Sequence, residues 1–191
     1  MKEIKFQNDA ALQIARRYAF FANHDQRPGT RRLSDPFFQA LSALTGAGKT
    51  PILAEAVTLI RNELQGEPIV LWMSKARSVV TQTYNNFNGG KYASLIEGFQ
   101  VCAIKDLKPA MVEDGGTPLL VLTTTGLFNN KDQAEGDLKI YRAAQDSQGG
   151  KSMWQRLIDR NDGQARRPLI IVYDEAHNLS EQQTDILHEL Q

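Results

Sequence analysis

Short runs of consecutive apolar residues alternate in this chain with segments of helical periodicity, and no other feature limits the possible folds as much. The apolar runs lie at 37–43, 68–73, 99–104, 118–123 and 169–173, and the helical segments at 8–21, 49–64, 76–87 and 180–190. A strand that is apolar along its whole length is buried on both faces, as in parallel sheets that helices cover on both sides. The alternation therefore predicts an α/β fold, a three-layer domain with a mainly parallel sheet.

The length of the chain allows one such domain. Its 191 residues can bury one substantial core but hardly two. We therefore assign residues 1–191 to a single domain. The polar, glycine-bearing stretch 143–167 is predicted to form a surface excursion within it, with a short helix near 153–158.

The composition excludes several classes of protein. The single cysteine, Cys102, excludes an internal disulfide framework, a zinc site of several thiolates and a four-cysteine iron–sulfur cluster. The chain starts without an apolar signal segment, and its longest apolar runs are far too short to span a bilayer. We expect a cytoplasmic protein with no membrane partner. Because the 22 basic and 22 acidic residues balance, any contact with DNA should be local and weak in this chain alone.

A glycine-rich turn before the helical segment 49–64 carries the strongest local signal. Residues 43–50 read Ala-Leu-Thr-Gly-Ala-Gly-Lys-Thr, which fits the phosphate-loop pattern Gly-x4-Gly-Lys-Ser/Thr except that Ala43 replaces the first glycine. Backbone N–H groups in such a turn form an anion-binding nest, and the following helix directs its positive end at the phosphates. The pattern predicts that Lys49 neutralises the β and γ phosphates of ATP and that the Thr50 hydroxyl binds Mg²⁺. The loop residues that would line the phosphates are Thr45, Gly46, Ala47 and Gly48.

A second Gly-Lys-Ser sequence, at residues 150–152, serves as an internal comparison. It follows a polar stretch and not a strand, so we interpret it as an ordinary loop. Pro51, directly after Thr50, is tolerated in a first helical turn. It has no N–H group, however, so the first loop should bind phosphate with one backbone donor fewer.

Two adjacent carboxylates follow the last apolar run. Residues 169–177 read Leu-Ile-Ile-Val-Tyr-Asp-Glu-Ala-His, which places Asp174 and Glu175 at the carboxyl end of a strand, where ligands bind in open α/β sheets. Asp174 would hold Mg²⁺, directly or through water, and Glu175 would orient and deprotonate the attacking water. Alone, the pair is better explained as a helix cap. Together with Lys49 and Thr50, two halves of one Mg-ATP site become the better explanation.

The two motifs together resemble a known group of proteins. Ala-x-Thr-Gly-x-Gly-Lys-Thr with Asp-Glu-Ala-His is similar to the signature pair of superfamily 2 DEAD/DEAH-like helicases, in their N-terminal RecA-like domain. Within that superfamily, residues 70–83 resemble the motif Ia region of type III restriction enzyme helicase (Res) subunits, and residues 121–129 a later DNA-facing motif. The resemblance spans about residues 6 to 177. It implies a P-loop ATPase domain that couples Mg-ATP hydrolysis to movement on DNA.

The resemblance implies roles for further residues. Gln7 after Phe6 is similar to the glutamine motif that recognises the adenine edge, and His177 would link the nucleotide site to a second domain. Contacts to the backbone of one nucleic-acid strand, without sequence preference, would come from Ser74, Lys75, Arg77, Thr123 and Thr124. Alternatives stay open for most of these residues. Gln7, Lys75 and Arg77 could be solvated residues at helix starts, and the two threonines could cap strand ends.

The resemblance also implies parts that these 191 residues do not contain. The motor of such proteins continues past the acidic motif and adds a second RecA-like domain with arginine fingers. We therefore expect an incomplete helicase domain that binds ATP but hydrolyses it very slowly, since an external finger contributes about 10³–10⁵ in rate. The expected partners are DNA, the second RecA-like domain and a methyltransferase or specificity subunit.

Two other functions stay open on the sequence. An iron–sulfur repair-type helicase can share the sequence Asp-Glu-Ala-His-Asn-Leu, but the single cysteine and the short gap between the motifs argue against it. A non-motor module that binds nucleotide as a regulatory switch fits the missing motor parts, whereas the intact Lys49, Thr50, Asp174 and Glu175 argue against it. The sequence does not fix whether the nucleic acid is DNA or RNA.

Overall fold

The structure, a computed structural model, describes residues 5–24, 39–43, 46–128, 150–160, 166–174 and 190. The chain begins with helices α1 (Lys5–His24) and α2 (Lys49–Arg61), strand β1 (Ile69–Ser74) and helix α3 (Arg77–Phe87). The later elements, with η for a 3₁₀-helix, are η1 (Ala93–Ile96), β2 (Gln100–Ala103), η2 (Ile104–Asp106), α4 (Pro109–Glu113), β3 (Leu119–Thr124), η3 (Thr125–Phe128), α5 (Met153–Asp159) and β4 (Leu169–Tyr173). Each predicted apolar run after residue 65 is thus a strand, with bounds that shift by one or two residues at most.

The described strands form one parallel sheet in the order β2-β3-β1-β4. β1 lies between β3 and β4, with Ile69 opposite Leu119 on one side and Leu169 on the other. Every residue of β1 is buried, because helices cover both faces of the sheet. The prediction of an α/β fold with a mainly parallel sheet is therefore confirmed.

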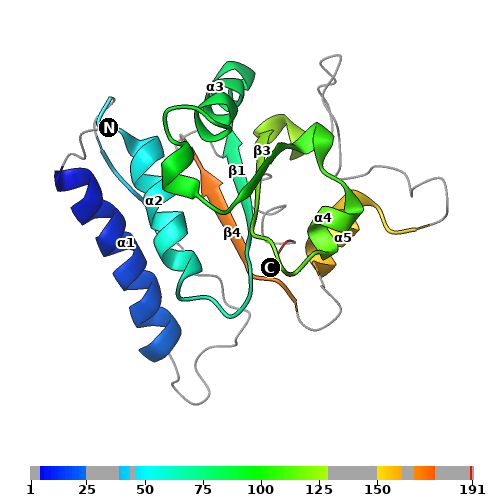
Figure 1. Cartoon of the computed structure of the whole chain (residues 1–191), viewed down its shortest axis with the longest axis horizontal. Coiled ribbons are helices and arrows are strands. Elements are labelled where there is room, and N and C mark those ends of the chain that lie inside the picture. The colour runs from blue at the N-terminus through cyan, green and yellow to red at the C-terminus, as the bar shows by residue number, and fades with distance from the viewer. Residues whose placement is uncertain are drawn as a thin grey trace.

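Alternate residues of β1 pack into two separate cores, one on each face of the sheet. Val70 and Trp72 pack with α2 and α3, where the Trp72 ring meets Phe87 edge to face at 5.0 Å between ring centroids. Leu71 and Met73 pack on the opposite face with α4 and α5. Figure 1 shows α2 and the α4–α5 pair on opposite sides of the strands. The sheet is thus the middle layer of three.

Helix α1 lies outside α2 and against it (Figure 1). The contact is made by small and branched apolar side chains, with Ala11 of α1 and Ile52 and Ala56 of α2 all buried. α2 is therefore fixed from two sides, by the sheet and by α1. No helix in the described part of the chain combines the length and apolar character that crossing a membrane requires.

Two sequence predictions about this fold need correction. The strand predicted at 37–43 is not formed by residues 39–43, which have no regular structure. The stretch 143–167 is not a mere surface excursion in its described residues, because α5 packs its Trp154 and Leu157 into the core beside β1. The predicted short helix within that stretch is present.

A buried arginine, Arg167, ties together the amino ends of the strands. It directly precedes β4 and is only 3% exposed. Its guanidinium donates hydrogen bonds of 2.7–3.4 Å to five backbone carbonyls: Glu67 and Pro68 before β1, Met111 and Val112 in α4, and Thr117 before β3. Because a buried cation is costly unless its donors are satisfied, these five bonds explain how this charge can occupy the interior.

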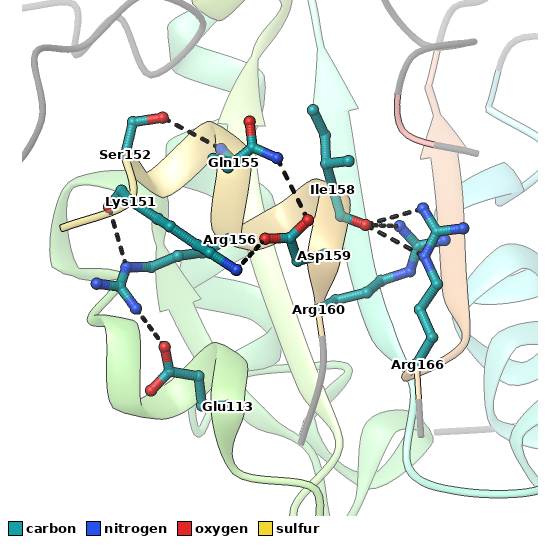
Figure 2. Close-up of polar contacts among 9 residues, drawn as sticks. All are labelled: Glu113, Lys151, Ser152, Gln155, Arg156, Ile158, Asp159, Arg160 and Arg166. Atoms are coloured by element: carbon teal, nitrogen blue, oxygen red, sulfur yellow. Dashed lines mark hydrogen bonds and ion pairs between the residues drawn. The ribbon is translucent and has the colours of Figure 1, made fainter. Parts of the chain in front are cut away.

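A second buried arginine, Arg160, ends α5 with a left-handed backbone (φ 31°). It donates to the carbonyls of Leu157, Ile158, Arg167 and Leu190, while the exposed Arg166 donates to the same Ile158 carbonyl (Figure 2). Burial lowers the pKa of Arg160 to about 10, and the nearby Arg166 lowers it further in the same direction. Arg160 is therefore still a cation at neutral pH, where it satisfies the last carbonyls of α5.

An ion pair between α2 and the start of β1 predicts a pH-dependent stability. Arg61 donates two hydrogen bonds of 2.6 and 2.8 Å to Glu67, and these bonds are the main reason that the pKa of Glu67 lies below its usual value. A lowered pKa of a carboxylate stabilises the fold above the unfolded pKa, and this contribution disappears as the pH falls through the folded pKa. We expect Glu67→Gln to lower the free energy of unfolding by about 0.5–1 kcal/mol at pH 7. In urea titrations, the difference from the wild type should shrink below about pH 4, and a difference that stays constant there would contradict this origin.

Candidate nucleotide-binding site

The phosphate-loop residues that the structure describes, 46–50, have the backbone that anion binding requires. Gly46 and Gly48 have φ angles of 82° and 81°, a left-handed conformation that glycine adopts at little cost. Gly48 is the N-cap of α2, and no side chain caps this helix. The first N–H groups of α2 therefore have no side-chain acceptor, which leaves the positive end of the helix available to an anion.

The second motif reaches the same place because of how the chain runs. α2 leads through residues 62–68 into β1, so α2 is antiparallel to the strands and starts at their carboxyl ends. Asp174 directly follows β4, and its N–H donates to the Met73 carbonyl of β1 over 2.8 Å. The Thr50 hydroxyl lies 3.4 Å from a carboxylate oxygen of Asp174. Two side chains that are 124 residues apart in sequence thus meet beside the loop.

The Thr50–Asp174 pair has the chemistry of a magnesium site in a nucleotide pocket. Two oxygens bound to one Mg²⁺ in octahedral geometry lie roughly 3 Å apart, close to the separation observed. Mg²⁺ in such sites uses one or two protein oxygens and completes its shell with phosphates and water. In keeping with this, no cluster of three or more His, Cys, Asp or Glu side chains that could hold a metal occurs among the described residues. The residues present therefore fit a metal that arrives with a nucleotide.

Gln7, in the first turn of α1, contacts the loop itself. Its side-chain Nε2 donates a hydrogen bond of 2.9 Å to the Ala47 carbonyl. The sequence predicted Gln7 near the nucleotide but not this bond, since any residue supplies a carbonyl and no pattern marks which one is used. Lys49 is half-buried at the start of α2. The predicted residues Thr45, Glu175 and His177 lie outside the described residues.

The five predicted nucleic-acid contacts divide into buried and accessible side chains. Ser74 and Thr123 are only 1% and 2% exposed, because each belongs to an interior strand and points into a covered face of the sheet. Their predicted direct contacts are therefore wrong for this arrangement. Thr124 is half-buried, whereas Lys75 and Arg77 are exposed where α3 begins.

A shallow polar groove of about 540 Å³ continues from Arg77 along the outer face of α3, and the sequence analysis missed it. Its lining is hydroxyls and amides at helical spacing: Ser78, Thr81, Gln82, Asn85 and Asn86. The signal that could have revealed it is this polar stripe on a helix whose Thr83 and Phe87 face the core. Such side chains can donate to phosphate oxygens without reading a base.

The second Gly-Lys-Ser sequence has a different use, as Figure 2 shows. The Lys151 ammonium lies 2.5 Å from a carboxylate oxygen of Asp159. The Ser152 hydroxyl accepts a hydrogen bond from the Gln155 N–H and so caps α5. Both side chains that would serve a phosphate loop are thus engaged in holding α5, as expected of an ordinary loop.

These contacts predict that Lys151 contributes nothing to nucleotide binding. We expect Lys151→Ala to leave the affinity for Mg-ATP within twofold of the wild type and to lower the free energy of unfolding by about 0.2–1 kcal/mol, as for an exposed ion pair. Equilibrium titration and urea unfolding measure the two quantities. A large loss of nucleotide affinity would mean that the second sequence, and not the first, binds phosphate.

Comparison with known families decides where the chain belongs. A family model described as "Type III restriction enzyme, res subunit" matches residues 5–190. The chain belongs to this family. Searches of curated proteins and of solved structures found no match. As a member of the type III restriction enzyme res subunit family, the chain is a helicase-type, ATP-binding domain, and its parallel sheet is that of a RecA-like fold. The resemblance to superfamily 2 helicases is thereby confirmed.

Proposed function

We propose that this domain binds Mg-ATP between residues 46–50 and Asp174 and forms the first half of a motor that moves along DNA. The contact between the Thr50 hydroxyl and the Asp174 carboxylate carries the proposal. A chance phosphate loop and a chance acidic strand end would have no reason to meet at one edge of the sheet. The family match supports ATP use in general, and the restriction-type motor is the finer proposal.

Each protein group has a distinct task in this site. The uncapped start of α2 and the Lys49 ammonium bind the β and γ phosphates. Thr50 and Asp174 hold Mg²⁺, which when bound neutralises charge on the same phosphates. Glu175, which directly follows Asp174, would orient and deprotonate the attacking water. We assign no further catalytic group to this chain.

Nucleic acid would lie across the start of α3. The exposed Lys75 and Arg77, the half-buried Thr124 and the polar groove on α3 together supply charge and hydrogen-bond donors to a phosphate backbone. The balanced overall charge implies weak binding by this chain alone. His177 would transmit the state of the nucleotide to a second RecA-like domain. A methyltransferase or specificity subunit would complete the assembly.

Nucleotide binding is tested by titrating the folded chain with a fluorescent ATP analogue in Mg²⁺. Saturable binding that unlabelled ATP displaces is the expected result. A folded wild-type chain that binds no nucleotide would overturn the proposed site.

The motor proposal is tested separately, by ATP turnover. We expect the chain alone to turn ATP over very slowly, because a finger arginine from another domain contributes about 10³–10⁵ in rate. When a second RecA-like domain is joined to it, added DNA should increase turnover. A regulatory nucleotide switch would bind ATP equally well and show no such stimulation.

A further inference from the structure

Gln7 lies against the phosphate loop in a way that restrains its backbone. Its Nε2 is bonded to the Ala47 carbonyl, and a Cβ placed on Gly48 would overlap the same Nε2. The amide of Gln7 therefore rests on the Cα of Gly48 as well as on the carbonyl before it. The glycine at this position is required twice, by its left-handed φ and by the close approach of Gln7.

The bond to Ala47 determines which way the next N–H group points. The peptide between Ala47 and Gly48 is trans, as are all peptides in the described chain. In a planar trans peptide the carbonyl and the N–H point in opposite directions. A carbonyl held toward Gln7 therefore directs the Gly48 N–H away from Gln7. Together with the left-handed glycines on either side, this is the arrangement that an anion-binding nest requires.

The base of this restraint is rigid. α1 packs on α2 through Ala11, Ile52 and Ala56, which are 0–1% exposed. Gln7 sits one turn before Ala11 on the same helix. Its position relative to the loop is thus fixed by the core that joins the two helices, and the loop is held before any ligand arrives.

We propose that Gln7 is a positioning residue that presets the phosphate loop for a polyphosphate, whatever base the nucleotide carries. This inference rests on the proposed nucleotide site and replaces the adenine-recognition role that the sequence suggested for Gln7. Its consequence is specific. Removal of the side-chain donor should weaken binding of the phosphate chain itself, equally for different nucleotides.

Hydrogen–deuterium exchange of the ligand-free protein tests the restraint directly. Gln7→Met keeps the length of the side chain and removes the donor, and Gln13→Met makes the same change at an exposed glutamine of α1. We expect backbone amides of residues 46–49 to exchange about 2- to 10-fold faster in Gln7→Met than in the wild type, because one hydrogen bond is lost. Gln13→Met should match the wild type. Unchanged exchange in Gln7→Met would overturn the proposal, even if the chain bound no nucleotide.

Ligand competition tests the consequence for binding. Mg-ATP, Mg-GTP and inorganic tripolyphosphate are each used to displace a fluorescent ATP analogue from the three proteins. We expect Gln7→Met to weaken all three ligands by a similar factor of about 2 to 10. A loss confined to ATP would overturn the proposal and restore adenine recognition. A wild type that binds none of the ligands would instead refute the proposed function, and the exchange experiment would still decide the role of Gln7.

Discussion

Lys49→Ala is expected to lower the affinity of the chain for Mg-ATP by about 100-fold. A charge-assisted hydrogen bond contributes about 1.5–3 kcal/mol, and an ammonium at the start of α2 faces the most highly charged part of the ligand. Each 1.4 kcal/mol corresponds to a factor of about ten in affinity. Because Lys49 is at the first turn of a helix that α1 and the sheet hold in place, its loss should leave the fold intact. Equilibrium titration with a fluorescent ATP analogue measures the change, with circular dichroism as the check on folding.

Lys151→Ala is the matched control for this experiment. It removes the same side chain from the other Gly-Lys-Ser sequence, where the ammonium pairs with Asp159. Equal affinities for the wild type and Lys49→Ala, or equal losses in both variants, would contradict the assignment of the phosphate loop to residues 43–50.

Arg167→Met is expected to lower the free energy of unfolding by about 3–5 kcal/mol, the largest stability effect that the structure predicts. Methionine fills similar space but donates no hydrogen bond, so five backbone carbonyls at the amino ends of the strands lose their donor. The loss of the buried charge offsets part of this cost. A whole domain is stable by about 5–15 kcal/mol, so the variant should be close to unfolding. Urea unfolding followed by the fluorescence of the buried Trp72 and Trp154 measures the change.

The neighbouring arginine offers the comparison. Arg166 is exposed and donates only to the Ile158 carbonyl at the end of α5. Arg166→Met should therefore cost less than about 1 kcal/mol. If the two variants lost similar stability, the five carbonyl contacts of Arg167 would not be what holds the strand ends together.

The sheet and the pairing of the two motifs were predictable from the sequence. A strand covered on both faces must be apolar throughout, so 68–73 and 169–173 stood out. The predicted run 37–43 met the same criterion, yet residues 39–43 form no strand. Whether an apolar run becomes a strand depends on a neighbour to pair with, and that is a property of the fold and not of the run.

Contacts to backbone carbonyls were not predictable in the same way. Arg160 and Arg167 look like surface charges in a polar stretch, but their acceptors are carbonyls from segments far away in the sequence. Gln7 likewise bonds the Ala47 carbonyl across 40 residues. Every residue carries a carbonyl, so the sequence holds no mark of which one a distant side chain will use. Ser74 illustrates the converse, a polar residue that is buried because of where its strand lies.

The shared site is tested most directly by how much Mg²⁺ strengthens ATP binding in the wild type, Thr50→Val, Asp174→Asn and the double variant. If Thr50 and Asp174 hold one metal ion, each single change should remove most of the strengthening and the double variant should lose little more, because groups that act through one ligand are not additive. In EDTA, Asp174→Asn should bind ATP no more weakly than the wild type, since it removes a negative charge beside the phosphates. Mg²⁺ strengthening that survives both single changes, or losses that simply add, would contradict a metal site shared by these two residues.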